Sequence, residues 1–260
     1  MRSYGSLGLP HGANNLRRFY QNEWLGLKFS DLSKTSLFRK ANIKFYDNFY
    51  QVFFNKYSSY DDLPKQYIES KKQVAFHLLP YLRNKSRILS IGCGIGLVEK
   101  KLLDLLKQEN FKNKKFDQKI IALEPSENSM RWMDLDSIEA VNGFFPDDLE
   151  ERVEFDFAYA ILLDYSLDDF EYLSLLKNII KYGITDVYFS VSVGHPLGFY
   201  QKFKEIVLIF LSIIKLKNCG QFWGYLRTLD EHLFLFKKAG FSNISNGQYS
   251  DGQYWICAKL

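Results

Sequence analysis

The chain has 260 residues, of which 47% are hydrophobic and 25% are charged, a composition that excludes a disordered protein. Its 34 basic and 30 acidic residues leave a net charge of +4, too mild and too dispersed to predict a nucleic-acid-binding surface. The longest apolar run, Ile206 to Ile214, is far shorter than the roughly 20 residues that a membrane span needs. Residues 1–15 lack the apolar core of a signal peptide, so we expect a cytoplasmic protein.

Cysteine and histidine spacing gives no support for a metal site. Cys93, Cys219 and Cys257 are far apart, and no histidine stands at ligand spacing from them. We therefore expect no structural metal and no disulfide framework, in keeping with a reducing compartment.

The first part of the chain is predicted to be helical. Aromatic and aliphatic residues recur at three- and four-residue spacings in 15–24, 41–57 and 63–82, with Pro80 near the end of the third segment, where it is expected to bend the helix. These segments predict an N-terminal helical cap over residues 1–85.

From Arg87 onward, short apolar runs alternate with helical stretches. The predicted strands are 87–91, 119–123, 138–141, 155–162 and 185–193, and the predicted helices are 97–108, 126–133 and 170–182. This alternation predicts a parallel sheet that is covered by helices on both faces.

The last part of the chain contains an insertion and a closing hairpin. The segment 198–217 predicts a helical insertion, placed within about 196–224. Thr228 and Glu231 have capping-box spacing, so a helix is expected to start at Leu229 and to stop at Gly240. The segments 241–246 and 253–260 predict an antiparallel hairpin at the edge of the sheet.

A glycine-rich turn follows the first strand of the sheet. Gly92, Gly94 and Gly96 allow the backbone to turn sharply and to approach a ligand closely. The dinucleotide fingerprint requires its third glycine at the position of Leu97, so the pattern of an NAD site fails. Glu124 closes the second strand, where its carboxylate can accept hydrogen bonds from two ribose hydroxyls.

Together these segments resemble a known family. The segments 88–96, 121–125 and 155–160 are similar to the first, second and fourth strand motifs of class I S-adenosylmethionine-dependent methyltransferases, and Ala239-Gly240-Phe241 before the hairpin is also typical of them. The resemblance covers about residues 70–260. It implies an α/β, Rossmann-like sheet, mostly parallel with a C-terminal antiparallel hairpin, a methyltransferase domain over 86–260, and S-adenosylmethionine as cofactor without a metal.

The resemblance also implies roles for individual residues of the glycine turn. Gly92, Cys93, Gly94 and Gly96 would pack against the methionyl and ribose parts of the cofactor. Ser90 stands where many members carry an acid, which puts the usual contact to the methionine amine in doubt.

On the adenine side, the resemblance gives roles to two further segments. Glu124 would hold the ribose hydroxyls, and Pro125 would line the adenine. In the segment Asn142-Gly143-Phe144, Phe144 stands where an Asp is common and would contact the adenine ring. Asn142 or a backbone group would then form the hydrogen bond with the adenine amino nitrogen.

Candidate catalytic residues follow the fourth and fifth strands, because ligands bind beyond the carboxyl ends of such strands. His195 could take a hydroxyl proton near pH 7, or it could simply end the strand and bond the local backbone. Asp164 is the alternative base or an orienter of the acceptor, and Tyr165 is a candidate substrate contact. His11 could fold over the site as part of a lid, or it could belong to a loose terminus.

The other two histidines are assigned no function. His77 lies among apolar residues and is expected in the core, and His232 is expected at the surface.

The predicted function is methyl transfer to a small molecule, and oxygen is favoured over nitrogen or carbon as the methylated atom. A weak similarity of the segment 143–149 favours the hydroxyl of a saccharide, phosphorylated or nucleotide-linked metabolite in bacterial surface-polysaccharide or secondary-metabolite biosynthesis. The alternatives are an RNA or protein methyltransferase and a non-catalytic binding protein with this fold. Lysines flanking the apolar run of the insertion would also suit a helix on a membrane surface.

Overall fold

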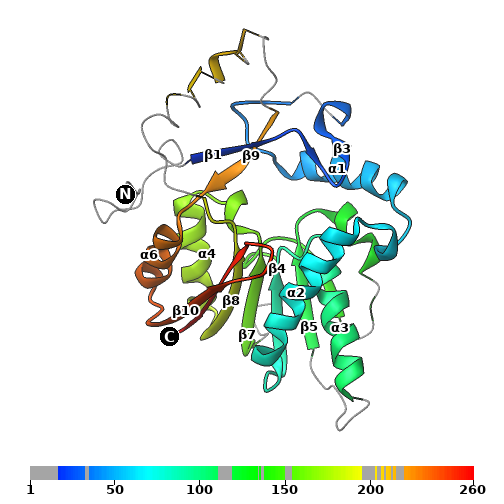
Figure 1. Ribbon diagram of the computed structural model, residues 1–260. Helices are drawn as coiled ribbons and strands as arrows, with labels where there is room; N and C mark the ends of the chain where they lie inside the picture. The colour runs from blue at the N-terminus through cyan, green and yellow to red at the C-terminus, as the bar shows by residue number, and fades with distance from the viewer. Residues whose placement is uncertain are drawn as a thin grey trace.

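The computed structural model describes residues 17–32, 35–110, 119–133, 135, 138–149, 154–194, 203, 206–207, 209–211, 213–214 and 220–260, with residues 109–110 given by their backbone alone. Figure 1 shows a sheet flanked by helices, with a smaller group of elements above one end of it.

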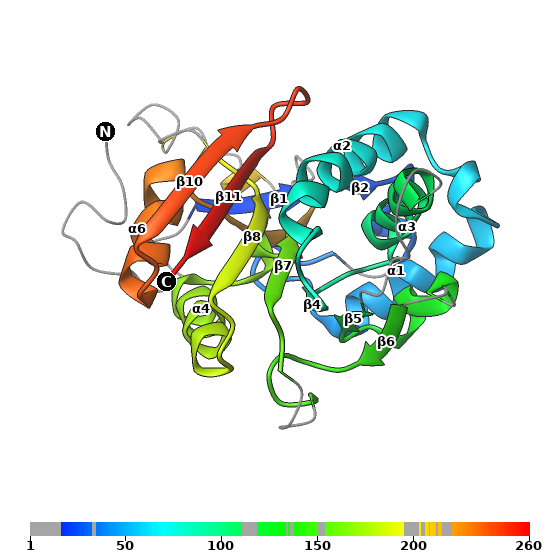
Figure 2. The same cartoon turned by 90° about the horizontal axis from the view of Figure 1, so that it is seen from below.

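The centre of the molecule is a seven-stranded sheet in the order β10-β11-β8-β7-β4-β5-β6 (Figure 2). Its parallel strands are β4 (Arg87–Ile91), β5 (Lys119–Glu124), β6 (Ile138–Asn142), β7 (Phe157–Ile161) and β8 (Asp186–Val191). The antiparallel edge consists of β10 (Asn243–Gln248) and β11 (Tyr254–Lys259). The predicted Rossmann-like sheet with a C-terminal antiparallel hairpin is confirmed.

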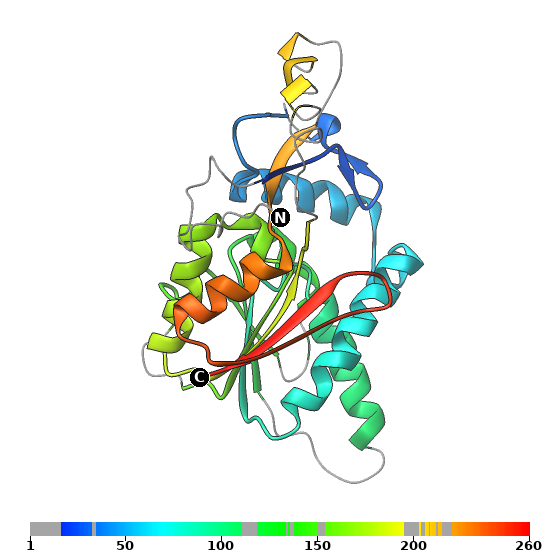
Figure 3. The ribbon, with the colours of Figure 1, turned by 60° about the vertical axis from the view of Figure 1, so that its left-hand side comes forward.

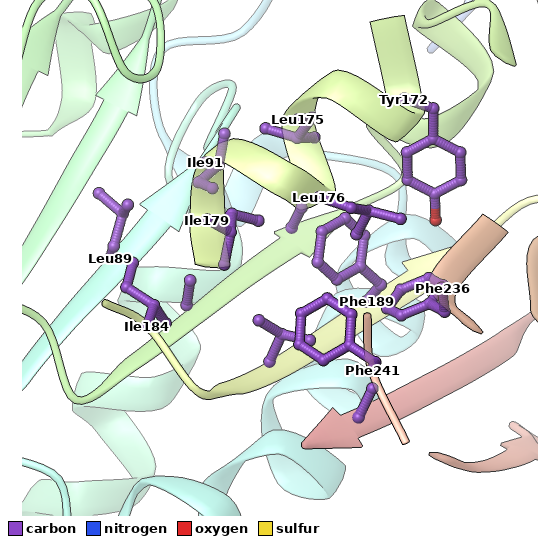
Figure 4. Packing of buried hydrophobic residues seen from close by; sticks show 14 of the residues in the cluster. Leu89, Ile91, Tyr172, Leu175, Leu176, Ile179, Ile184, Phe189, Phe236 and Phe241 are labelled. Carbon is purple, nitrogen blue, oxygen red and sulfur yellow. The ribbon is translucent and has the colours of Figure 1, made fainter. Parts of the chain in front are cut away.

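Helices cover both faces of this sheet because alternate strand residues point to opposite sides. Helices α2 (Lys65–Leu82) and α3 (Leu97–Asn110) pack on the face that receives Ile88, and α4 (Asp169–Lys181) and α6 (Leu229–Ala239) pack on the face that receives Leu89. Figure 4 shows the second of these cores, in which leucines and isoleucines of α4 meet Phe189, Phe236 and Phe241.

The predicted bounds of α6 are confirmed by its caps. The Thr228 side chain accepts a hydrogen bond from the Glu231 N–H, and the Glu231 side chain accepts one from the Thr228 N–H. The helix ends at Gly240, whose φ of +125° is a conformation that glycine adopts at little cost.

Short 3₁₀ turns connect several of these elements. They are η3 (Phe29–Asp31), η4 (Tyr60–Asp62), η5 (Glu127–Trp132) and η6 (Asp164–Ser166).

A second group of elements, which we call the cap, lies over the carboxyl ends of the parallel strands (Figure 1). It consists of β1 (Arg17–Gln21), β2 (Glu23–Trp24), β3 (Leu27–Lys28), α1 (Ile43–Lys56) and β9 (Gln221–Leu226). Its interior is a cluster of aromatic side chains, among them Phe29, Phe49 and Trp223.

The helix predicted over residues 15–24 is wrong, since β1 is a strand that pairs antiparallel with β9, from Arg17 with Leu226 to Gln21 with Gln221. The partner strand lies near the other end of the chain, so local aromatic spacing carried no information about it. Helix α2, which we expected in the N-terminal cap, packs against α3 beside the sheet. A domain boundary at residue 85 stays a prediction.

The insertion predicted within 196–224 is helical at described positions between Phe203 and Ile213, but its last part forms β9. Figure 3 shows the described helical pieces between Phe203 and Ile213 beyond the cap. Most of the described apolar side chains of this segment are exposed, whereas Ile209 and Leu211 are partly buried. The exposed ones are Phe203, Ile206, Val207, Phe210, Ile213 and Ile214. Within the described part of the chain, no helix is long and apolar enough to cross a bilayer.

Candidate active site

A cavity of about 720 Å³ opens where the carboxyl ends of the parallel strands meet the cap. The strand ends contribute the glycine turn after β4, Glu124 of β5, Gly143 after β6, Leu162 after β7 and Ser192 after β8. Ligands of open α/β sheets bind at this edge, so the cavity is the candidate site.

The glycine turn brings backbone rather than side chains to the cavity. Gly92 (φ +70°) and Gly94 (φ +57°) line it together with Cys93. Gly96 has a φ of +72° but lies outside the lining, and a Cβ there would be 1.6 Å from Met133 Sδ. The third glycine therefore permits close packing between α3 and η5, whereas the first two face the ligand space.

Glu124 is held rigidly beside this turn. Its Oε2 accepts a hydrogen bond of 2.9 Å from the Gly94 N–H, and its Oε1 accepts one of 3.0 Å from the Ser126 N–H. Burial raises the pKa of the Glu124 carboxyl, and these two hydrogen bonds oppose that rise. Each carboxylate oxygen can accept a further hydrogen bond, so Glu124 can support the turn and still bind ligand hydroxyls.

The predicted adenine-side residues divide into two groups. Pro125, Gly143 and Phe144 line the cavity, and Phe144 is 50% exposed, so its ring is available to a ligand. Asn142 lies outside the lining, and its Nδ2 donates to the backbone oxygens of Glu124 (3.0 Å) and Pro125 (3.1 Å). That amide therefore fixes the end of β6 against β5, and its contact with an adenine stays a prediction.

Ser90 is placed beside an acid that the sequence interpretation missed. The Ser90 Oγ donates to Glu99 Oε1 at 2.6 Å, and the Tyr159 hydroxyl donates to the same oxygen at 2.8 Å. Glu99 is 1% exposed and lines the cavity with Ser90. Its position in the first turn of α3, directly after the glycine turn, was the only signal that could have identified it.

The cap contributes an aromatic wall to the other side of the cavity. Tyr46 of α1 and Trp223 of β9 lie with ring centroids 5.2 Å apart, and Tyr165 stacks on Trp223 at 6.3 Å. The remaining aromatic lining residues of this wall are Phe19, Trp24, Tyr50 and Tyr67. Burial raises the pKa of Tyr46 to about 12, so its hydroxyl stays protonated at neutral pH.

One basic residue that lines the cavity, Lys40, is already neutralised. Lys40 Nζ lies 3.0 Å from Glu171 Oε2 and donates to the Ser166 backbone oxygen at 2.6 Å. Both Lys40 and Glu171 line the cavity, so this part of the site presents an ion pair rather than a net charge.

The two predicted catalytic residues have different outcomes. His195 lies outside the described residues, although the chain leading to it is fixed by a 2.7 Å hydrogen bond from the Gly194 N–H to the Arg227 backbone oxygen. Asp164 is 1% exposed and lies outside the lining, behind Ser192, whose N–H donates to its Oδ2 at 3.0 Å. The role of each as a base stays a prediction.

Asp164 has a buried histidine as a neighbour. His232 is 0% exposed, and its Nε2 lies 3.6 Å from Asp164 Oδ2. The surface position expected for His232 is wrong, because the start of α6 faces α4, where the His232 ring meets Tyr172 at 5.7 Å. Burial lowers the pKa of His232 to about 3 and raises that of Asp164 to about 7.

Two further histidine predictions have clear outcomes. His77 was expected in the core but is exposed, because it lies on the outer side of α2, with its ring 5.2 Å from that of Tyr249. His11 lies outside the described residues. Among the predicted substrate contacts, Tyr165 lines the cavity.

No model of a known protein family matches this sequence, and no curated protein matches it either. Solved structures do match its fold. Human N-acetylserotonin methyltransferase in complex with S-adenosylmethionine is 15% identical, with a TM-score of 0.52 over 84% of this chain and 56% of that chain. DhpI in complex with S-adenosylhomocysteine is 12% identical, with a TM-score of 0.57 over 84% and 95%.

A third match is the mitomycin 7-O-methyltransferase MmcR, at 15% identity and a TM-score of 0.54 over 74% of this chain and 54% of that chain. The chain thus spans a little over half the length of MmcR and of the human enzyme. At these identities the likeness shows the fold alone, which this chain shares with these three structures.

Proposed function

We propose that the protein binds S-adenosylmethionine and transfers its methyl group to a small-molecule acceptor. The observation that carries this proposal is the Glu124 carboxylate, which lies at the end of β5, borders the cavity and is fixed to the Gly94 N–H. A carboxylate held in this way can accept hydrogen bonds from the two hydroxyls of a ribose.

The remaining lining residues fit the nucleoside part of this cofactor. Gly92 and Gly94 leave room for close approach of a ligand to the backbone, and Pro125 and Phe144 offer apolar surface to a purine ring. The cofactor supplies a methyl carbon that its sulfonium has already activated for in-line displacement. The protein then has to hold the acceptor in line and exclude water.

The cap is suited to both tasks. Its aromatic side chains border the acceptor side of the cavity, and α1 reaches across to the glycine turn, where a Cβ on Gly94 would lie 3.3 Å from the Tyr50 hydroxyl. A second contact is the 2.6 Å hydrogen bond from Ser126 Oγ to Asp47 Oδ1. The same helix thus borders both halves of the cavity.

The acceptor that this wall fits best is an uncharged molecule with a flat apolar body and a hydroxyl. Tyr46, Tyr165 and Trp223 can stack on such a body, and the Lys40–Glu171 pair offers little attraction to a phosphate. Two of the structural neighbours are named for N-acetylserotonin and for a mitomycin 7-O position, which supports a small-molecule acceptor. A saccharide, phosphorylated or nucleotide-linked acceptor is the competing prediction from the sequence.

Proton removal from a hydroxyl acceptor is assigned to His195, with Asp164 as the alternative. Since positioned proton transfer contributes about 10²–10⁴-fold, His195→Ala should lower kcat by that order with little change in cofactor affinity. Asp164→Asn should then retain most activity. The opposite pattern would assign the base to Asp164, and an effect of neither variant would indicate an acceptor that needs no base.

Calorimetric titration with S-adenosylhomocysteine tests the proposal directly. The wild-type protein should bind it, and its Tm should rise with ligand concentration as mass action requires. Glu124→Ala should weaken binding by about 1–3 kcal/mol, because ribose hydroxyls lose their charged acceptor. Glu127→Ala, which removes an exposed acid three residues later, is the matched control. A well-folded wild-type protein that binds no S-adenosylhomocysteine would refute the proposal.

The acceptor is tested with panels of aromatic phenols and of nucleotide-linked sugars. Radiolabelled methyl transfer to phenols but not to sugars supports the uncharged, flat acceptor, and the reverse result supports the competing prediction. Transfer to RNA or protein alone, or to nothing despite cofactor binding, would favour the other two alternatives.

A further inference from the structure

One part of the cavity lining consists of polar side chains, and we call this part the polar recess. The lining residues that define it are Lys71, Ser90, Glu99 and Gln253. These four come from α2, β4, α3 and the segment before β11, so the fold rather than local sequence assembles them.

Glu99 has one oxygen that is satisfied and one that is not. Ser90 Oγ and the Tyr159 hydroxyl both donate to Oε1, at 2.6 and 2.8 Å. The other oxygen, Oε2, is buried and has no hydrogen-bond partner within the described residues. A buried carboxylate oxygen without a donor is costly, so the recess is short of a hydrogen-bond donor, preferably a cationic one.

Gln253 repeats this pattern. Its Oε1 is likewise buried without a partner among the residues that the structure describes. Two buried acceptors at the margin of one cavity therefore lack donors, and both belong to side chains that line it. An ammonium group carries three donors and could satisfy both.

Lys71 supplies the opposite charge in the same recess. It is 8% exposed, and its Nζ lies 5.5 Å from the centre of the Tyr67 ring. No described carboxylate lies within ion-pair distance of its Nζ, although the Glu99 charge acts on it from further away. Burial lowers the pKa of Lys71 to about 8, so it remains mostly protonated at neutral pH and can attract an anion.

An acid oxygen and an ammonium that both lack a partner among the described residues, at one margin of a cavity, match a zwitterion. We propose that this recess binds the amino-acid end of S-adenosylmethionine, with Glu99 and Gln253 accepting from its α-ammonium and Lys71 binding its α-carboxylate. The inference rests on the proposed function, since it places the methionyl part of the same cofactor. Ser90 is then a positioning residue that holds the Glu99 carboxylate. Glu99 would supply the acid that many methyltransferases carry at the position of Ser90.

Three nucleosides separate the two charges of the ligand. S-adenosylhomocysteine carries both groups, its decarboxylated derivative carries only the ammonium, and 5′-methylthioadenosine carries neither. The wild-type protein should bind them in that order of decreasing affinity, as measured by calorimetry. This comparison requires no variant, so it tests the proposal even if a substitution prevents folding.

Two near-isosteric substitutions then assign the groups. Glu99→Gln keeps an acceptor for Ser90 and Tyr159 but loses the charge, so binding of the two ammonium-bearing ligands should weaken by about 10- to 100-fold. Lys71→Met should weaken only S-adenosylhomocysteine, and neither variant should change 5′-methylthioadenosine binding. The matched controls are Glu69→Gln and Lys72→Met, which alter exposed residues of α2.

The outcomes are distinct. If the wild type binds none of the three nucleosides, the proposed function itself fails. If it binds all three equally well, or if Glu99→Gln weakens all three alike, the cofactor site stands and the zwitterion receptor is refuted.

Discussion

Asp164 and His232 should give the folded protein two opposing pH dependences that nearly cancel. Burial raises the pKa of Asp164 from 3.8 to about 7, so between these values the folded state holds a proton that the unfolded state has released. The free energy of unfolding therefore falls as pH rises. Burial lowers the pKa of His232 from 6.5 to about 3, so there the unfolded state holds the extra proton, and the free energy of unfolding rises with pH.

The magnitude follows from linkage. Each group contributes a slope of about 1.4 kcal/mol per pH unit, negative for Asp164 and positive for His232, wherever its two states differ by one proton. Both slopes apply between about pH 4 and 6.5, since that interval lies between the folded and unfolded values of each group. The pair alone should therefore leave stability nearly flat in this interval, and each slope should become visible when the other group is removed.

The assay is urea unfolding of the wild type, His232→Gln and Asp164→Asn at closely spaced pH values. Subtracting the free energy of unfolding of each variant from that of the wild type at the same pH removes the titration of all other groups. The difference for His232→Gln should rise by about 3 kcal/mol from pH 4 to 6.5, and the difference for Asp164→Asn should fall by about the same amount. The double variant should give a flat difference. Two flat single-variant differences, or two of the same sign, would refute the argument from burial.

Three other predictions concern packing and the cap. Gly96→Ala should lower the free energy of unfolding by about 2–4 kcal/mol, because it combines a left-handed φ with a clash against Met133; a wild-type Tm would contradict this. Arg227→Met should lower the free energy of unfolding by about 3–5 kcal/mol, because Arg227 Nε lies 2.8 Å from the buried Asp169 carboxylate. Adding Asp169→Leu should recover most of this loss in urea unfolding, and no recovery would argue against a stabilising Arg227–Asp169 ion pair. Deleting residues 1–30 should impair methyl transfer more than S-adenosylhomocysteine binding, and a folded truncated protein with the full rate would show that this N-terminal part of the cap is dispensable.

The central sheet, the glycine turn and the position of Glu124 at a strand end could be predicted because their signals are local. The apolar run 87–91 followed by glycines predicts both a strand and a turn, and Glu124 is identified by its position at the end of the next strand. The capping box at Thr228 similarly fixed the start of α6. In each case the residues that carry the signal are the residues that form the contact.

The parts that could not be predicted depend on contacts between distant segments. β1 looks helical from its aromatic spacing and becomes a strand only because β9 offers it a partner. His77 and His232 were assigned to the wrong environments because helix phase alone does not say which side meets the sheet. Glu99 acquires its significance from Ser90 and Tyr159, which reach it from two neighbouring strands.

The pairing of Arg17 with Leu226 has a consequence for the order in which the molecule is assembled. β4, β5 and β7 can associate once the middle of the chain has been synthesised, whereas β1 must wait for β9, which is synthesised after all the parallel strands of the sheet. Contacts of such long sequence separation form late, because loop closure precedes any gain from pairing. The parallel sheet should thus fold before the cap closes over it. In native-state hydrogen exchange, the amides of β1 and β9 should open in a partial unfolding step that leaves the sheet protected.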